Sequence, residues 1–210
     1  MSIRPSASTP IASRKLAGRR EPASRRRSAG FNLLELMTVI TIGAILTAFS
    51  VSSYKYVTNS NRVSTEVNSL LGDFMLARSE AVKEGVNVIT CPLATGATPS
   101  CNAVATWQGG WMIFADTDND GKYTSGTDVL IRVQNAFNST DTFTSSDSTV
   151  QSVTFNREGF AVGLPSNASN YITITLHTTP VIANSQWTRC VQVTSFGGLT
   201  TEHQGKGGCT

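Results

Sequence analysis

One carboxylate at the start of an apolar run is the feature that most constrains this chain. A basic leader, residues 1–30, runs into the apolar run, and Glu35 is the only acid near the start of that run. An ionised side chain inside a bilayer costs about 2.5–3.5 kcal/mol, so in a membrane helix Glu35 needs a cationic partner. Cleavage between Gly30 and Phe31 would supply one, because a free α-amine titrates near ~8 and is mostly protonated at neutral pH.

The residues at this junction resemble the class III signal of type IV prepilins and of type II secretion pseudopilins. They comprise a basic leader, then Gly30, Phe31 and Glu35, and then a hydrophobic segment. The resemblance implies that prepilin peptidase cuts after Gly30, that the new amine of Phe31 is methylated, and that Glu35 sets the register of one subunit on the next. The leader is longer than is common in this class, a departure that a start codon assigned too far upstream would explain.

Three other interpretations account for the apolar run, but not for the acid Glu35 near its start. Leu36–Val51 has no charged residue, and with residues 31–34 it approaches the ~20 residues of a plain single-pass anchor. Residues 48–50, Ala-Phe-Ser, approximate a secretory cleavage site, and the arginines at 25–27 resemble a twin-arginine signal. None of these interpretations gives a reason for Glu35, so the prepilin interpretation is favoured.

Charge is distributed unevenly along the chain. Residues 1–30 hold 8 basic residues and one acid, a net charge of +7, whereas the other 9 basic and 13 acidic residues give −4. A basic flank beside an apolar segment stays in the cytoplasm. We therefore expect a single-pass inner-membrane protein that contacts lipid before assembly and has its carboxy-terminal domain in the periplasm.

The pattern predicts an α+β fold in which a long N-terminal helix, membrane-spanning in its first half, packs on a C-terminal antiparallel β-sheet domain. Four segments are expected. They are a cleaved leader at 1–30, a transmembrane and assembly helix at 31–52, the amphipathic half of the same helix at 53–85, and a β-rich domain at 86–210. The helix is expected to end at about Glu84, because Gly85 suits a left-handed cap.

The second half of the predicted helix carries an apolar stripe at helical spacing. The stripe consists of Val63, Val67, Leu70, Leu71, Phe74, Met75, Ala77, Ala81 and Val82. Charged residues are expected on the other faces, namely Arg62, Glu66, Asp73, Arg78 and Glu80. A stripe of this kind needs an apolar surface to cover, and the sheet that follows is expected to provide it.

After Gly85, short β-rich runs alternate with turn residues and predict strands. The predicted strands are Val86–Thr90, Gly110–Ala115, Val129–Val133, Val150–Phe155, Tyr171–Thr175 and Arg189–Thr194. Residues 135–149 are expected to form an exposed polar loop or an irregular edge, because Ser, Thr, Asn and Asp dominate them.

A second resemblance covers this β-rich part. The segments Trp107–Phe114, Asp116–Gly121, Val129–Val133 and Phe155–Gly159, with two late cysteines, resemble GspH/FimT-type minor pilins. This implies a minor pilin that primes or caps a type IV pilus near its tip, with other minor and major pilins as partners. A minor pseudopilin of a type II secretion system would have all of the sequence features described above, and it is the alternative to a type IV pilin.

Four cysteines, Cys91, Cys101, Cys190 and Cys209, allow three disulfide connectivities. No pair has the C-x-x-C spacing of a zinc or redox motif, and an exported domain lies in an oxidising compartment. Pairing of Cys91 with Cys101 and of Cys190 with Cys209 is favoured, because each bond closes a short loop and the second ties down a glycine-rich terminus.

Asp116, Asp118 and Asp120, followed by Gly121, repeat oxygen donors at the spacing of a calcium loop. The acid that closes such a loop is missing, because the twelfth position is Thr127. A hairpin rich in Asp and Asn accounts for the same residues and is favoured over calcium binding, and no other cofactor is indicated.

DNA binding and catalysis have little support in the sequence. Some FimT-type pilins bind DNA through a Gly-Arg-x-Arg motif, but the corresponding stretch here is Gly197–Thr200, without arginine. Only two histidines are present, His177 at a strand end and His203 in an expected solvated tail. They form no catalytic arrangement by spacing. The three tryptophans, Trp107, Trp111 and Trp187, are expected to be packing residues.

Overall fold

A computed structural model describes residues 30, 32–164, 170–178, 187–206, 208 and 209, except for the side chains of 49–53, 55 and 56. The chain divides into two units, Met1–Thr47 and Ala48–Thr210. One helix, α1 (Leu33–Glu84), begins in the first unit and continues in the second. Its end is the expected one: the backbone N–H of Gly85 donates to the oxygen of Ala81 at 3.0 Å, and Gly85 has a φ of 72°.

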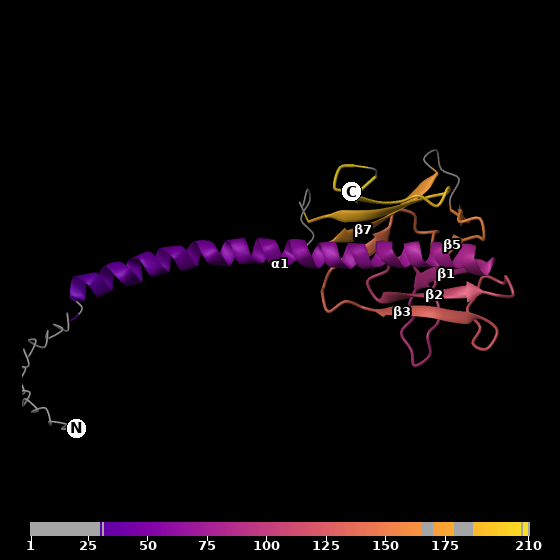
Figure 1. The fold of residues 1–210 in the computed structure, drawn as a ribbon, viewed down its shortest axis with the longest axis horizontal. Helices are drawn as coiled ribbons and strands as arrows, with labels where there is room; N and C mark the ends of the chain where they lie inside the picture. Colours follow the sequence, from indigo (N-terminus) through magenta and orange to yellow (C-terminus); the bar gives the residue numbers. More distant parts are fainter. Residues whose placement is uncertain (1–29, 31, 165–169, 179–186, 207, 210) are drawn as a thin grey trace, which may run out of the picture. The chain divides into compact units, whose positions relative to one another are not determined.

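The described β-strands form two antiparallel sheets (Figure 1). The first sheet has the order β3-β2-β1-β5-β6 and consists of β1 (Asn87–Pro92), β2 (Gly110–Asp116), β3 (Val129–Asn135), β5 (Val153–Phe155) and β6 (Ala161–Val162). The second has the order β4-β7-β8-β9 and consists of β4 (Thr142–Ser145), β7 (Tyr171–His177), β8 (Arg189–Thr194) and β9 (Leu199–His203). The second half of α1 runs across both sheets in Figure 1.

Three strands were not expected from the sequence. Residues 135–149, expected to be an exposed loop or an irregular edge, contain the regular edge strand β4, and Phe143 in this strand is only 2% exposed. The short strand β6 extends the first sheet, and β9 includes His203, which therefore lies in a strand and not in a tail. These strands are only two to five residues long, too short to show a clear alternating pattern, so sequence reasoning does not detect them.

The core lies between the second half of α1 and the two sheets. Six of the nine predicted stripe residues are buried: Val63, Val67, Leu70, Phe74, Ala77 and Ala81. Met75 and Val82 are exceptions, with exposures of 49% and 56%. Phe74 packs edge-on against Trp107, with ring centroids 5.8 Å apart, and both rings are fully buried. The apolar face of the helix is therefore narrower than the sequence predicts.

Two of the charged residues expected on other faces of the helix than the apolar stripe are also buried. Glu66 is 2% exposed and Asp73 is 1% exposed, so both lie within the helix–sheet interface. Their placement corrects the expectation, because a buried carboxylate needs compensating donors and the sequence does not show where those donors are.

Candidate assembly site

Glu35 lies in the first turn of α1 and is exposed. A carboxylate is favoured there, because the free N–H groups at a helix start carry partial positive charge. The Thr38 hydroxyl donates to the backbone oxygen of Glu35 at 2.8 Å, and among the described residues the carboxylate itself has no ion-pair partner. Gly30 is described and exposed, whereas Phe31 lies outside the described residues, so the processing site and the role of Glu35 stay predictions.

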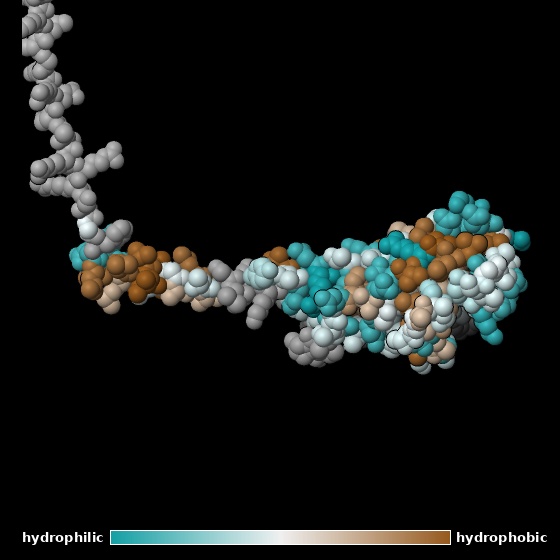
Figure 2. All heavy atoms as spheres, turned by 90° about the horizontal axis from the view of Figure 1, so that it is seen from below, coloured by the Kyte–Doolittle hydropathy of each residue, from teal (hydrophilic) through white to brown (hydrophobic). Residues whose placement is uncertain are grey.

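The first unit presents an almost continuous apolar surface around Glu35. Nine large apolar side chains there are each more than half exposed: Leu33, Leu34, Leu36, Met37, Val39, Ile40, Ile42, Ile45 and Leu46. Figure 2 shows hydrophobic residues along this stretch of the helix. An exposed apolar surface of this kind marks contact with another protein or with lipid. No helix among the residues with described side chains combines the length and the hydropathy of a membrane span.

In the second unit, a bidentate ion pair joins α1 to the start of β4. The guanidinium of Arg62 donates through Nε and Nη2 to the two carboxylate oxygens of Asp141, each at 2.9 Å. The Asp141 side chain is fully buried, and the Arg62 side chain is 36% exposed. Planar bidentate pairing fixes orientation as well as distance, so this contact holds the helix in register with the second sheet.

Asp73 joins α1 to the first sheet. The indole N–H of Trp111 on β2 donates to Asp73 Oδ2 at 2.7 Å, and Nη1 of Arg132 on β3 lies 3.1 Å from Asp73 Oδ1. Burial raises the pKa of Asp73, and the indole hydrogen bond and the Arg132 charge act against that rise. The helix is thus attached by polar contacts to two neighbouring strands.

Glu66 is the least compensated carboxylate on this face of the helix. One of its oxygens, Oε2, is buried and lacks a hydrogen-bond partner among the described atoms. Burial raises the pKa of Glu66, and the nearby charge of Asp141 raises it further, against lowering contributions from Ser139 and Arg62. Burial here therefore favours the protonated form of Glu66.

Arg78 joins α1 to the turns of both sheets. Its Nε donates to the backbone oxygen of Gly159 in the β5–β6 turn at 2.9 Å. Gly197, in the β8–β9 turn, approaches the same place so closely that a Cβ there would lie 2.0 Å from the Gly159 oxygen and 2.9 Å from Arg78 Nε. Only glycine fits at this position, where the φ of 75° also disfavours other residues.

The acidic segment between β2 and β3 forms a closed hairpin loop. Asp116 accepts backbone N–H groups from Asp120 at 3.2 Å and from Gly121 at 3.0 Å, while Asp128 accepts from Thr117 and Thr124. Carboxylate oxygens of Asp116, Asp118 and Asp120 lie within 4.8 Å of one another. Backbone donors thus stabilise this loop in the way the hairpin interpretation requires, and calcium binding stays the less favoured interpretation.

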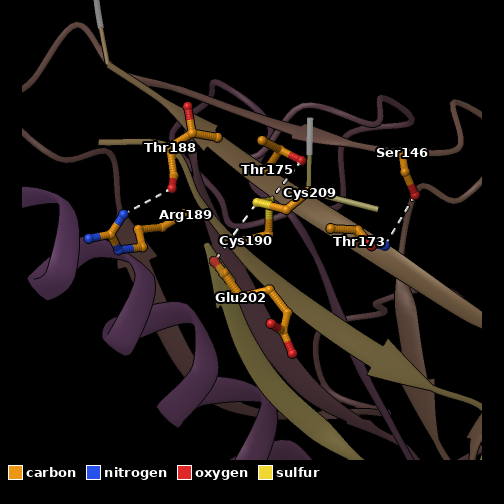
Figure 3. The surroundings of a disulfide bond; sticks show 8 residues. All are labelled: Ser146, Thr173, Thr175, Thr188, Arg189, Cys190, Glu202 and Cys209. Carbon is orange, nitrogen blue, oxygen red and sulfur yellow. Dashed lines mark hydrogen bonds between the residues drawn. A yellow bond between two sulfur atoms is a disulfide. The ribbon is translucent and has the colours of Figure 1, made fainter. Parts of the chain in front are cut away.

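Two disulfides are present, and they have the connectivity expected from the sequence: Cys91 with Cys101 and Cys190 with Cys209. Figure 3 shows the second bond, which attaches the carboxy-terminal residues to β8 beside Glu202 of β9. Cys190 is fully buried and Cys209 is 1% exposed. This disulfide therefore anchors the end of the chain to the second sheet.

In the stretch Gly197–Thr200, which was compared above with a DNA-binding motif, Gly197 and Gly198 lie in a tight turn and Leu199 and Thr200 begin β9. The N–H of Gly197 donates to the oxygen of Thr194, and the N–H of Thr194 donates to the oxygen of Gly198, both at 2.9 Å. No arginine lies in this turn; Arg78 of α1 lies against Gly197, and the nearest basic residues along the chain are Arg189 in β8 and Lys206 after β9. Such sparse basic charge does not support strong phosphate binding.

Comparison with known proteins gives one family and two solved structures. The family model described as "Type II transport protein GspH" matches residues 66–197. Two crystal forms of the type IV minor pilin FimU of Pseudomonas aeruginosa are similar in structure. The first is 18% identical with a TM-score of 0.48 over 69% of this chain and 91% of FimU, and the second is 21% identical with a TM-score of 0.44 over 68% and 91%. No curated protein matches the chain.

Proposed function

The chain belongs to the GspH family of type II transport proteins, and from that premise we propose that it is a minor pilin that primes or caps a type IV pilus. The family consists of pilin and pseudopilin subunits, which are structural proteins and not enzymes. In the proposed pathway, prepilin peptidase cuts the precursor after Gly30 and the processed subunit enters the fibre near its tip. Other minor and major pilins are its proposed partners.

The observation that carries this proposal is the exposed apolar surface of residues 33–47 of the helix, in which Glu35 is the only charged residue. Side chains such as Leu34 and Ile40 are 68% and 62% exposed, so the described residues of their own unit leave them largely uncovered. In the proposed function they contact inner-membrane lipid before assembly and the helices of neighbouring subunits afterwards. Apolar helix-to-helix contact then replaces lipid contact.

Glu35 is proposed to set the register of that packing. Its carboxylate is exposed in the first helical turn, where it is free to meet an amine from a neighbouring subunit. The proposed amine is the methylated N-terminus of Phe31. A charge pair in a low-dielectric environment has a large penalty for misalignment, because a shift leaves two uncompensated charges. This penalty makes a single acid sufficient to select one axial position.

The second unit is proposed to act as a rigid head. Arg62, Asp73 and Arg78 connect the helix to Asp141, to Trp111 and to Gly159, which belong to different parts of the two sheets. These contacts fix the β-domain on the part of α1 that belongs to the same unit. A head fixed in this way presents a defined surface to the adjacent subunits.

The proposal is tested by complementing a strain that lacks this subunit with Glu35→Gln and with Thr38→Val as a matched control in the same turn. Glu35→Gln removes the charge at nearly constant size and should abolish incorporation into fibres, because the register contact is lost. Thr38→Val should assemble normally. Normal incorporation of Glu35→Gln would contradict the proposal.

A minor pseudopilin of a type II secretion system is the second candidate, and it is favoured by the description of the matching family. The two functions differ in what is lost on deletion. Loss of surface pili with normal protein secretion supports the pilus function, whereas loss of secretion with normal pili supports the pseudopilin function.

A further inference from the structure

A groove between α1 and β9 has apolar walls and one fixed cation. It is lined by Met75, Arg78, Ser79, Val82 and Leu199 and has a volume of about 570 Å³; we call it the Arg78 groove. Met75 and Val82 are the two residues of the predicted stripe that are not covered by the sheets. Exposed apolar side chains that line one groove together, as these do, form a contiguous patch of the kind that marks a protein-interaction site.

Further apolar side chains are exposed in the turns that approach this groove. Phe160 follows Gly159 and is 45% exposed, and Phe196 precedes Gly197 and is 74% exposed. Both glycines lie against the side chain of Arg78. Aromatic residues, Met and Arg are the residue types enriched in protein interfaces, and the glycine next to each phenylalanine lies against Arg78.

Arg78 is held in place without being neutralised. Its Nε donates to the backbone oxygen of Gly159, and no carboxylate in the described part of the chain forms an ion pair with it. The segments 165–169 and 179–186 contain no acidic residue. Other arginines of this domain, such as Arg62, Arg132 and Arg157, each pair with an acid. Arg78 therefore presents an uncompensated charge between apolar walls.

We propose that the Arg78 groove docks an acidic, apolar segment of a neighbouring pilin or pseudopilin subunit, whose Asp or Glu carboxylate pairs with the Arg78 guanidinium. A carboxylate flanked by apolar side chains complements both the charge and the walls of the groove. Because the guanidinium is already oriented by Gly159, little side-chain freedom is lost on binding. This inference rests on the proposed function, since it takes the partner from the same fibre.

The test uses the full chain in a host strain that carries differently tagged co-encoded pilin or pseudopilin subunits. A photo-crosslinking benzoylphenylalanine at Met75 should give an adduct with one tagged subunit, and the crosslinked peptide should contain Asp or Glu. Arg78→Gln should reduce the adduct about tenfold, because the charge pair is lost. Arg157→Gln, at an exposed arginine that pairs with Glu158, is the matched control and should leave the adduct unchanged.

Two further variants keep the outcome decisive. Leu199→Ser removes a groove wall without touching the Arg78–Gly159 hydrogen bond and should also reduce the adduct, even if Arg78→Gln impairs folding. Arg78→Glu combined with Lys at the crosslinked acid should restore it. The proposal is overturned by an adduct with lipid or with a second copy alone, by no adduct, or by an adduct that is insensitive to both groove variants. If fibres still form in those cases, the groove proposal fails while the proposed function stands.

Discussion

Asp73 on the helix accepts a 2.7 Å hydrogen bond from the indole N–H of Trp111 on β2, and both side chains are almost completely buried. The two residues are 38 positions apart in the chain. Their contact joins the apolar stripe of α1 to the centre of the first sheet. Without it, the interface would hold an unpaired indole donor and a less compensated carboxylate, both of which are costly to bury.

Replacement of Asp73 by Ala should therefore destabilise the domain. We expect a loss of about 1–3 kcal/mol in the free energy of unfolding, because the Trp111 donor is left unsatisfied. Asp73→Asn keeps an acceptor for the indole and removes a buried charge, so its loss should be less than half as large. Urea unfolding of the detergent-solubilised full chain, followed by circular dichroism, measures both values. Equal stability of Asp73→Ala and wild type would contradict the assigned role.

Glu66 should make stability depend on pH. Burial raises its folded-state pKa above the ordinary value of 4.5, so the folded protein binds the proton more tightly than the unfolded chain does. The Glu66 contribution is fully present below that ordinary value and is lost as pH rises through the raised pKa. Glu66→Gln, which stays neutral, should therefore gain stability relative to wild type as pH rises from 4 to 8.

The comparison between Glu66→Gln and wild type separates the effect of Glu66 on stability from that of the charged groups beside it. Asp141 and Arg62 contribute to the Glu66 site and are retained in both proteins, so the difference in stability reports the Glu66 carboxyl group. Unfolding curves at several pH values give that difference directly. A constant difference between the two proteins across this range would show that the Glu66 pKa is not raised.

Gly197 should tolerate no side chain. Gly197→Ala places a Cβ 2.0 Å from the Gly159 oxygen in a backbone with φ of 75°. Gly205→Ala is a matched control, since Gly205 has a φ of 82° and a Cβ added there would meet nothing within 4 Å. We expect the control to lose about 1–2 kcal/mol from backbone strain alone, and Gly197→Ala to lose clearly more in thermal or urea unfolding. Equal losses would mean that the turn moves freely away from Gly159.

Local patterns in the sequence predict much of this fold. Arg189–Thr194 has the predicted strand bounds, and the helix ends at Glu84 because Gly85 adopts the left-handed conformation. Both features depend only on residues that are close together in the sequence. The disulfide connectivity followed from short loop closure, which is also a local property.

Contacts between distant residues could not be predicted in this way. Helical periodicity places Glu66 and Asp73 beside the apolar stripe, but it does not show that Trp111 and Arg132 lie opposite Asp73 and make its burial possible. For the same reason the sequence did not indicate that Met75 and Val82 stay uncovered. Which faces of the helix the sheets cover depends on the topology of the whole domain.

The central claim is that the chain is processed between Gly30 and Phe31 so that a new amine becomes available to Glu35. Intact mass and amino-terminal sequencing of the protein extracted from membranes of its native host test this claim most directly. We predict a product that begins at Phe31 with a methylated amine, and a precursor of full length when prepilin peptidase is absent. A mature protein that begins at Val51, or one that retains residues 1–30 in the presence of the peptidase, would contradict the account.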